Sequence, residues 1–236
     1  MAVSYMADIY NNTPVTSQSV YDAYNGLLFS SDKRVFNKMV KRIELYMKVK
    51  DLAGDIMEVG VFKGAGMALF LKLKHMYEPN SLMKVIGFDY FEKDTLLDSL
   101  DGVNKESMAS VLSRVDQKEL SFESVWSRLL PYGADSFMLI RGDATLESKK
   151  FCLENPGAKI KMLYMDLDTG DATYAILKEL WGRVVKGGVV VFDEYAYHVW
   201  DESIGVDKFL KEIEGQYTSI DTKIYSPSMY IVKLVI

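Results

Sequence analysis

Short apolar runs alternate with helical patterns along most of the chain. The runs at 56–59, 84–88 and 137–140 each have the length of one buried strand. The segments 66–73 and 174–181 carry apolar residues at helical spacing. Strands that alternate with helices are typical of a parallel sheet covered by helices. The pattern therefore predicts an α/β fold with a mostly parallel sheet.

Three segments depart from this alternation. Residues 1–32 are polar and rich in tyrosine, and we expect an N-terminal arm, with a partly disordered tail as the alternative. Residues 94–130 hold two amphipathic helical patterns and no clear strand, which predicts a lid inserted over the carboxyl edge of the sheet. The segments 222–225 and 230–236 flank a Ser-Pro-Ser sequence and predict an antiparallel C-terminal hairpin. All of these belong to a single domain over 1–236.

A further helix is predicted between Asp32, which could cap it, and Gly54, which ends it. Apolar residues recur along this segment at the spacing of one helical face. They are Val35, Phe36, Met39, Val40, Ile43 and Met47.

Composition narrows the classes of function. Of the 236 residues, 49% are hydrophobic and 26% are charged, as in ordinary globular proteins. The net charge of -5 argues against nucleic acid as a partner, because phosphate binding needs a basic face. The single cysteine, Cys152, excludes an intrachain disulfide and is expected to be buried. With no secretory signal pattern and no membrane-spanning apolar run, we expect a cytoplasmic protein that binds no membrane.

Acidic residues follow two neighbouring apolar runs. Asp166 and Asp168 come after the run 162–165, and Asp193 and Glu194 come after the run 187–192. A short helical crossover makes these strands parallel neighbours, so their carboxyl ends lie at one edge of the sheet. Carboxylates that are brought together repel one another unless a cation or a shared proton offsets the charge. If the group that offsets Asp166, Asp193 and Glu194 is a cation, their oxygen-only ligand set suits Mg²⁺, Mn²⁺ or Ca²⁺ rather than zinc.

A glycine-containing turn joins the first strand to its helix. Its glycines, Gly60, Gly64 and Gly66, follow the spacing G-x-x-x-G-x-G, which differs from the dinucleotide pattern G-x-G-x-x-G. Phe62 takes up room that a pyrophosphate would need, and Glu58 would repel a diphosphate. A ligand with a positively charged end is therefore favoured, although a tight structural turn would give the same pattern.

Acidic residues also end the next two strands. Asp89 is placed to accept hydrogen bonds from ribose hydroxyl groups. Asp143 could accept one from an adenine amino group. Together with the turn, these residues predict a site for a nucleoside ligand with a cationic end.

These residues resemble class I S-adenosylmethionine-dependent methyltransferases, and specifically the macrocin O-methyltransferase family that acts on sugars of antibiotics. The similarity runs from about residue 34 to 209 and is strongest in 54–64, 88–92, 166–168 with Thr173, and 186–195. The resemblance implies a Rossmann-like sheet, S-adenosylmethionine as cofactor and bound Mg²⁺. The implied cofactor residues are Glu58, Gly60, Phe62, Gly64, Asp89, Asp143 and Asp166, and the implied metal ligands are Asp166, Asp193 and Glu194.

The chain departs from this family at two places. Members usually carry Asp-Asp where this chain has Asp193 and Glu194, which puts the third metal ligand in doubt. The histidine base of the family lies in the lid, but this chain has no histidine between His75 and His198. That role therefore does not transfer.

The expected function is methyl transfer to a hydroxyl group of a small molecule, such as a sugar of a natural product. Asp166 would act at the metal, and His198 or Asp168 would accept the proton. Asp168 could instead cap the helix near Gly170, and His198 could be a surface residue. The alternatives are a metal-independent methyltransferase, a nucleotide-dependent oxidoreductase and a non-catalytic S-adenosylmethionine-binding module. By analogy with the family, we expect a homo-oligomer, a dimer or larger.

Overall fold

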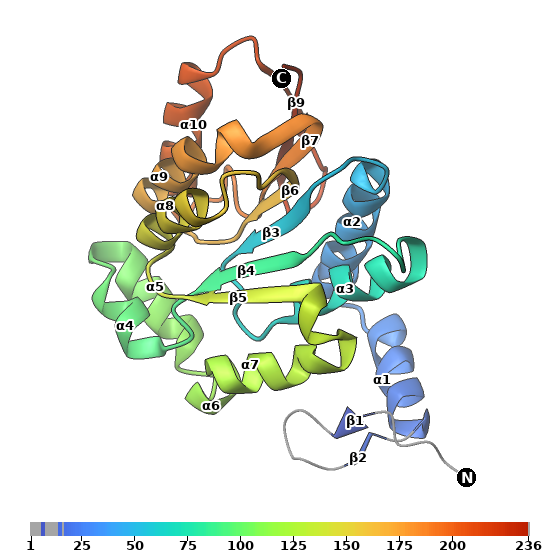
Figure 1. Ribbon diagram of the computed structural model, residues 1–236. Helices are drawn as coiled ribbons and strands as arrows, with labels where there is room; N and C mark the ends of the chain where they lie inside the picture. Colours follow the sequence, from blue (N-terminus) through green and yellow to red (C-terminus); the bar gives the residue numbers. More distant parts are fainter. Residues whose placement is uncertain (1–5, 8–13, 16, 236) are drawn as a thin grey trace.

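A computed structural model of the protein describes residues 6–7, 14–15 and 17–235. Its main sheet has seven strands in the order β5-β4-β3-β6-β7-β9-β8 (Figure 1). The pairs among β3, β4, β5, β6 and β7 are parallel, and β9 is antiparallel to both of its neighbours, β7 and β8. The strands are β3 (Asp55–Val59), β4 (Val85–Asp89), β5 (Phe137–Arg141), β6 (Ile160–Met165), β7 (Val184–Phe192), β8 (Tyr217–Asp221) and β9 (Met229–Lys233). The predicted α/β fold, mostly parallel with an antiparallel C-terminal end, is confirmed.

Helices cover both faces of the sheet, so the alternating side chains of each strand enter two separate cores. On β6, Tyr164 packs into one core and Leu163 into the other. The first core holds residues of α2 (Arg34–Val49), α3 (Ala65–Tyr77) and α7 (Phe122–Leu129). The second holds residues of α8 (Ala144–Glu154), α9 (Gly170–Leu180) and α10 (Glu202–Glu212), which include the buried Cys152.

Helix α2 packs on the sheet with a different face from the one that its apolar spacing indicates. Val35, Phe36 and Met47 are exposed. The buried residues are Arg42, Leu45, Tyr46 and Val49. The helix therefore turns a charged position, Arg42, toward the carboxyl edge of the sheet.

The C-terminal hairpin consists of β8 and β9, so the prediction that its first strand covers 222–225 is wrong. Thr222 begins the connecting loop instead, because its backbone N–H and its side-chain hydroxyl both donate to the carbonyl of Ser228, at 3.0 Å. The N–H of Ser228 in turn donates to the carbonyls of Phe192 and Asp193. These bonds fasten the loop to the end of β7.

The predicted lid divides into two parts. Helices α4 (Lys93–Asp98) and α5 (Gly102–Leu112) contribute one fully buried residue, Leu112. Beyond α6 (Gln117–Leu120), helix α7 is held in the core by Val125 and Leu129. Short 3₁₀ segments at Leu130–Tyr132, Ala134–Ser136 and Trp181–Arg183 complete the described helices.

At the N-terminal end, α1 (Ser17–Phe29) and the two-residue strands β1 (Met6–Ala7) and β2 (Pro14–Val15) extend away from the sheet (Figure 1). The remaining parts of the predicted arm, 1–5, 8–13 and 16, lie outside the described residues. Apolar side chains of α1, among them Val20, Tyr21 and Tyr24, are exposed. Among the described helices, none is long and apolar enough to cross a membrane.

A buried ion pair joins α2, α3 and β6 at the opposite end from the acidic strand ends. The ammonium of Lys161, which is 0% exposed, lies 2.8 Å from both carboxylate oxygens of Glu78. The hydroxyl of Tyr46 donates to Glu78 at 2.5 Å, and Lys161 also donates to the carbonyl of Lys50 at 3.3 Å. The pair thus holds the C-terminal half of α2 against the sheet.

Removal of Glu78 should destabilise the fold strongly. Glu78→Ala leaves the Lys161 ammonium buried without its counter-charge, which should lower the free energy of unfolding by about 3 kcal/mol. The matched control is Glu44→Ala, which breaks the exposed pair with Lys41 and should cost less than about 1 kcal/mol. Urea denaturation measures both changes. Equal losses in the two variants would contradict a structural role for the buried pair.

Hydrogen exchange should separate the two parts of the predicted lid. In the free protein, amides of α4 and α5 should exchange fast, because these helices bury almost no side chains. Amides of α7 should exchange at the slow rate of the core, because Val125 and Leu129 are 0% exposed. Mass spectrometry of peptides from 93–112 and 122–129 measures this. Slow exchange in both peptides would show that the whole insertion is rigid.

Candidate active site

The carboxyl ends of β3, β6 and β7 meet at one point of the sheet edge. Parallel pairing places Met165 opposite Phe192, so the next residues, Asp166 and Asp193, are neighbours. Gly60 follows β3 on the other side of Asp166. A Cβ atom on Gly60 would lie 1.9 Å from the backbone oxygen of Asp166, so only glycine fits there. The predicted parallel pairing of the two strands that end at Asp166 and Asp193 is confirmed.

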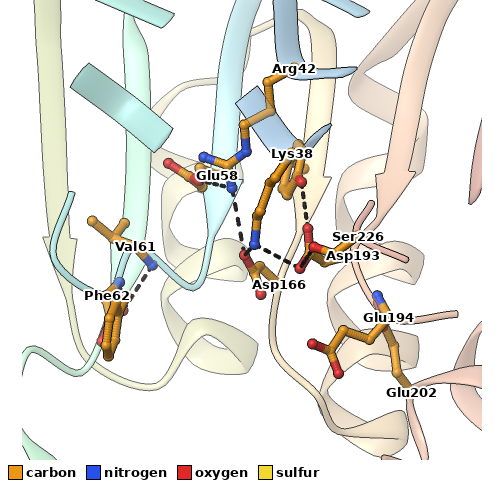
Figure 2. Close-up of polar contacts among 12 residues, drawn as sticks. Lys38, Arg42, Glu58, Val61, Phe62, Asp166, Asp193, Glu194, Glu202 and Ser226 are labelled. Carbon is orange, nitrogen blue, oxygen red and sulfur yellow. Dashed lines mark hydrogen bonds and ion pairs between the residues drawn. The ribbon is translucent and has the colours of Figure 1, made fainter. Parts of the chain in front are cut away.

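A lysine side chain lies between the two aspartates. The ammonium of Lys38, from α2, donates to Asp166 Oδ2 at 3.0 Å and to Asp193 Oδ2 at 2.7 Å (Figure 2). Burial alone would lower the pKa of Lys38, but the two carboxylates raise it above its ordinary value. The ammonium is therefore charged and offsets the repulsion between Asp166 and Asp193.

Asp193 is almost completely buried and uses both of its oxygens in hydrogen bonds. Oδ1 accepts from the hydroxyl of Tyr164 at 2.5 Å. Oδ2 accepts from Ser226 at 2.6 Å as well as from Lys38 (Figure 2). Burial would raise the pKa of Asp193, but the cations Lys38 and Arg42 and these hydrogen bonds lower it. Asp193 thus remains a carboxylate that is fixed in place.

One helical turn beyond Lys38, Arg42 makes a second buried pair. Its guanidinium lies 2.8 Å from Glu58 Oε1, 3.6 Å from Asp166 Oδ2 and 4.2 Å from the centre of the Tyr164 ring. A Cβ atom on Gly66 would lie 1.7 Å from this guanidinium and 2.0 Å from Glu58 Oε1, which explains the glycine. The other oxygen, Glu58 Oε2, is buried and has no protein partner. This oxygen therefore has acceptor capacity that no protein group in the described part of the chain uses.

The residues predicted to hold Mg²⁺ or Mn²⁺ do not fit a metal ion in this arrangement. The facing oxygens of Asp166 and Asp193 already bind the Lys38 ammonium. No group of three acidic, histidine or cysteine side chains in the described part of the chain is arranged to hold a metal.

Near Asp193, three acidic side chains each have one buried oxygen without a hydrogen-bond partner. They are Asp168, Glu194 and Glu202. Burial and the neighbouring carboxylates raise the pKa of Asp168 well above its ordinary value and the pKa of Glu194 to about 7. The other oxygen of Glu202 accepts from the backbone N–H of Glu194 at 2.9 Å. This side of the site can therefore take up protons near neutral pH.

Asp89 fastens the glycine-containing turn. Its Oδ2 accepts from the backbone N–H groups of Val61 and Phe62, both at 2.8 Å, and its Oδ1 accepts from that of Phe91 at 2.9 Å. Burial raises the pKa of Asp89, and hydrogen bonds from the backbone of Phe91, Phe62, Val61 and Tyr90 oppose that rise. Phe62 adopts a left-handed backbone with φ of 52° and is 44% exposed. The turn thus holds an aromatic side chain over the strand ends.

A cavity of about 250 Å³ opens beside these residues. Lys38, Asp89, Asp166 and Asp168 line its polar side. Its apolar walls come from Phe62 and from the predicted lid, where Leu96, Met108 and Leu112 face it. A neighbouring cavity of about 450 Å³ is lined by Tyr90 and by Asp143, which caps α8 by accepting from the N–H of Thr145. Of the predicted cofactor residues, the first cavity is lined by Gly60, Phe62, Asp89 and Asp166, and the second by Asp143. Glu58 lines a third cavity, of about 350 Å³, and Gly64 lines none of the three.

The protein family described as "Methyltransferase domain" matches residues 57–195, which is more than half of the chain. The chain belongs to this methyltransferase family. Its fold is similar to the crystal structure of CalS11, a calicheamicin methyltransferase, with a TM-score of 0.67 and 22% identity over 95% of this chain and 88% of that one. It is also similar to the O-methyltransferase NovP, with a TM-score of 0.65 and 17% identity over 85% and 80% of the two chains.

A more distant similarity is to an O-methyltransferase from Bacillus cereus in complex with SAH. The TM-score is 0.54 and the identity is 14%, over 92% of this chain and 90% of that one. Among curated proteins, none matches the chain in sequence. At these identities the solved structures establish the methyltransferase fold, while roles of individual residues rest on this chain's own geometry.

The methyltransferase site includes residues that the strand-end motifs do not reveal. They are Lys38, Arg42, Tyr164 and Ser226. One signal was present: Arg42 occupies the same helical face as Leu45, Tyr46 and Val49, where a charge is out of place unless it is paired. Tyr164 and Ser226 carry no comparable signal.

The two predicted base residues have different surroundings in this methyltransferase. Asp168 lines the cavity, and it does not cap α9, because the N–H of Gly170 donates to Asp201 at 2.8 Å. His198 is exposed, beyond Tyr197 in the loop that follows β7, and does not line the cavity beside Asp166. The role of either as a base stays a prediction.

Asp89→Ala should loosen the turn and weaken the binding of S-adenosylmethionine. The change removes the acceptor of three backbone N–H groups, each hydrogen bond to a charged group being worth about 1.5–3 kcal/mol. Calorimetry should show at least a tenfold loss of affinity, and amides 61–63 should exchange faster. Asp51→Ala, at an acid with an 85% exposed side chain, is the control. Unchanged affinity in Asp89→Ala would remove this residue from the cofactor site.

Proposed function

We propose that this methyltransferase uses S-adenosylmethionine to methylate a hydroxyl group of a small molecule, with a sugar of a natural product as the favoured acceptor class. The observation that carries the proposal is the unpartnered oxygen of Glu58 beside the turn, within a site that has three carboxylates and two cations. Such a site attracts a ligand with positive charge. The similarity to CalS11, described as a TDP-rhamnose 3'-O-methyltransferase, supports the acceptor class.

The cofactor would be held by the residues that end β3, β4 and β5. Glu58 Oε2 would accept from the ammonium of its amino-acid part, and Asp89, which lines the cavity, would serve its ribose. Asp143 lies where it could accept from adenine, through the oxygen that does not cap α8. Phe62 and Gly60 line the space between these groups. When bound, the cofactor supplies a sulfonium methyl group that an acceptor oxygen attacks as the S–C bond breaks.

The acceptor hydroxyl must lose its proton during this transfer. Asp168 is the candidate base, because it lines the cavity and one of its oxygens is buried without a partner. Burial and the neighbouring carboxylates raise its pKa, so in its ionised form it is a stronger base than an ordinary carboxylate. The proposal assigns no step to Mg²⁺ or Mn²⁺, since Lys38 occupies the aspartate oxygens that would bind the ion.

Self-association is a further part of the proposal. The exposed apolar residues of α1, including Val20, Tyr21 and Tyr24, would be covered in a homo-oligomer. A cytoplasmic location also stays a prediction. The alternative function, a non-catalytic module, would keep cofactor binding and lack turnover.

Asp168→Asn should separate binding from catalysis. The purified wild-type protein should bind S-adenosylmethionine in calorimetry. It should also transfer one methyl group to a nucleoside-diphosphate sugar, as detected by mass spectrometry. Loss of the base should lower kcat by about 10²–10⁴-fold and leave cofactor affinity within twofold. Asp135→Asn, at an exposed acid, should change neither value.

Two outcomes would contradict parts of this proposal. Full turnover of Asp168→Asn would exclude this residue as the base. Cofactor binding without transfer to any of a panel of sugar and phenolic hydroxyls would favour the non-catalytic module. Absence of cofactor binding would contradict the proposed function as a whole.

A further inference from the structure

Lys38 holds the position at which the sequence predicts a divalent cation. Its ammonium bridges Asp166 Oδ2 and Asp193 Oδ2 at 3.0 and 2.7 Å. A metal ion at this point would need the same two oxygens, at a distance of about 2.1 Å for Mg²⁺. The lysine and the metal therefore exclude one another.

The surroundings make this lysine a fixed part of the site. One turn later on α2, Arg42 is pinned between Glu58 and the Tyr164 ring. Below it, Leu45, Tyr46 and Val49 are at most 2% exposed. The helix can therefore not swing away from the strand ends without unpacking, and the aliphatic stem of Lys38 starts from an anchored backbone.

The aspartates are equally fixed on their other sides. Asp193 accepts from Ser226 and from Lys38 (Figure 2). Tyr164 also donates to it, which gives this carboxylate three donors. Asp166 Oδ2 also faces Arg42 at 3.6 Å. Hydrogen-bond donors and cations of the protein thus already bind the carboxylates of Asp166 and Asp193 and offset their charge. The predicted metal would have had this role.

We propose that the Lys38 ammonium is the resident cation of this site, replaces a divalent metal and offers its third N–H to the acceptor oxygen. This inference rests on the proposed methyl transfer. An ammonium has three donors, of which the aspartates take two. Lys38 lines the cavity together with Asp166 and Asp168, so the remaining donor is available to a bound hydroxyl. There it stabilises the negative charge that develops on the oxygen as the hydroxyl loses its proton.

Binding of Mn²⁺ alone tests the replacement without cofactor or acceptor. Electron paramagnetic resonance measures the free Mn²⁺ in solutions of chelator-treated protein. Lys38→Met should bind Mn²⁺ at least tenfold more tightly than the wild type, which should leave the ion free. The gain should disappear in the double variant Lys38→Met with Asp166→Asn. Lys41→Met is the matched control, because Lys41 lies on the same helix and pairs with the exposed Glu44. It should behave as the wild type does.

Two results in this experiment would overturn the proposal. One is Mn²⁺ binding by the wild type that Asp166→Asn abolishes. The other is a Lys38→Met protein, folded by circular dichroism, that binds Mn²⁺ no better than the wild type. If Lys38→Met does not fold, Lys38→Gln provides the same comparison, and the wild-type measurement requires no variant.

Turnover gives a second, independent test once an acceptor is in hand. The wild type should keep its kcat in EDTA, while Lys38→Met should lose at least 100-fold in kcat and Lys41→Met should lose nothing. Loss of wild-type activity in EDTA and its return with Mg²⁺ would overturn the proposal. Failure of the proposed methyl transfer would appear as absent cofactor binding or turnover in every variant, and would leave the Mn²⁺ result unchanged.

Discussion

The organisation of the site follows from the cost of burying carboxylates next to one another. Asp166, Asp193 and Glu58 lie at adjacent strand ends, and an unpaired buried carboxylate costs several kcal/mol. Their charges are offset by Lys38 and Arg42, which project from the same face of α2. Because the cations and the acids come from different elements, the site forms only when α2 docks on the sheet.

This dependence explains why the far end of α2 is built so rigidly. Lys161, Glu78 and Tyr46 fix the helix near its C-terminus, and the paired charges fix it near its N-terminus. The loop after β8 adds a third constraint, since Ser226 donates to Asp193 and Ser228 is bonded to the end of β7. The edge strands thus stabilise the same carboxylate that the helix neutralises.

The sequence predicts the parts of this arrangement that depend on local pattern. The strand runs, their acidic ends and the glycine-containing turn are visible because each lies within a few neighbouring residues. The partner of the acids is not visible, because Lys38 lies 128 and 155 positions from Asp166 and Asp193. Apolar spacing also favoured the wrong face of α2, since the need to pair Arg42 outweighed the burial of Val35 and Phe36. Residues 222–225 resemble a strand, but Thr222 bonds to Ser228 within the loop, and Ser228 in turn bonds to the end of β7.

A lysine and a metal ion would select acceptors differently. A divalent ion binds several oxygens and can chelate two neighbouring hydroxyl groups of a diol. The Lys38 ammonium has one donor left and can contact only one oxygen, along the direction of that N–H bond. Discrimination between hydroxyl groups must then come from the cavity walls, where Phe62, Leu96 and Met108 meet the rest of the acceptor. Such a site does not require a diol, and the shape of the region around α4 and α5 decides which hydroxyl reaches the methyl group.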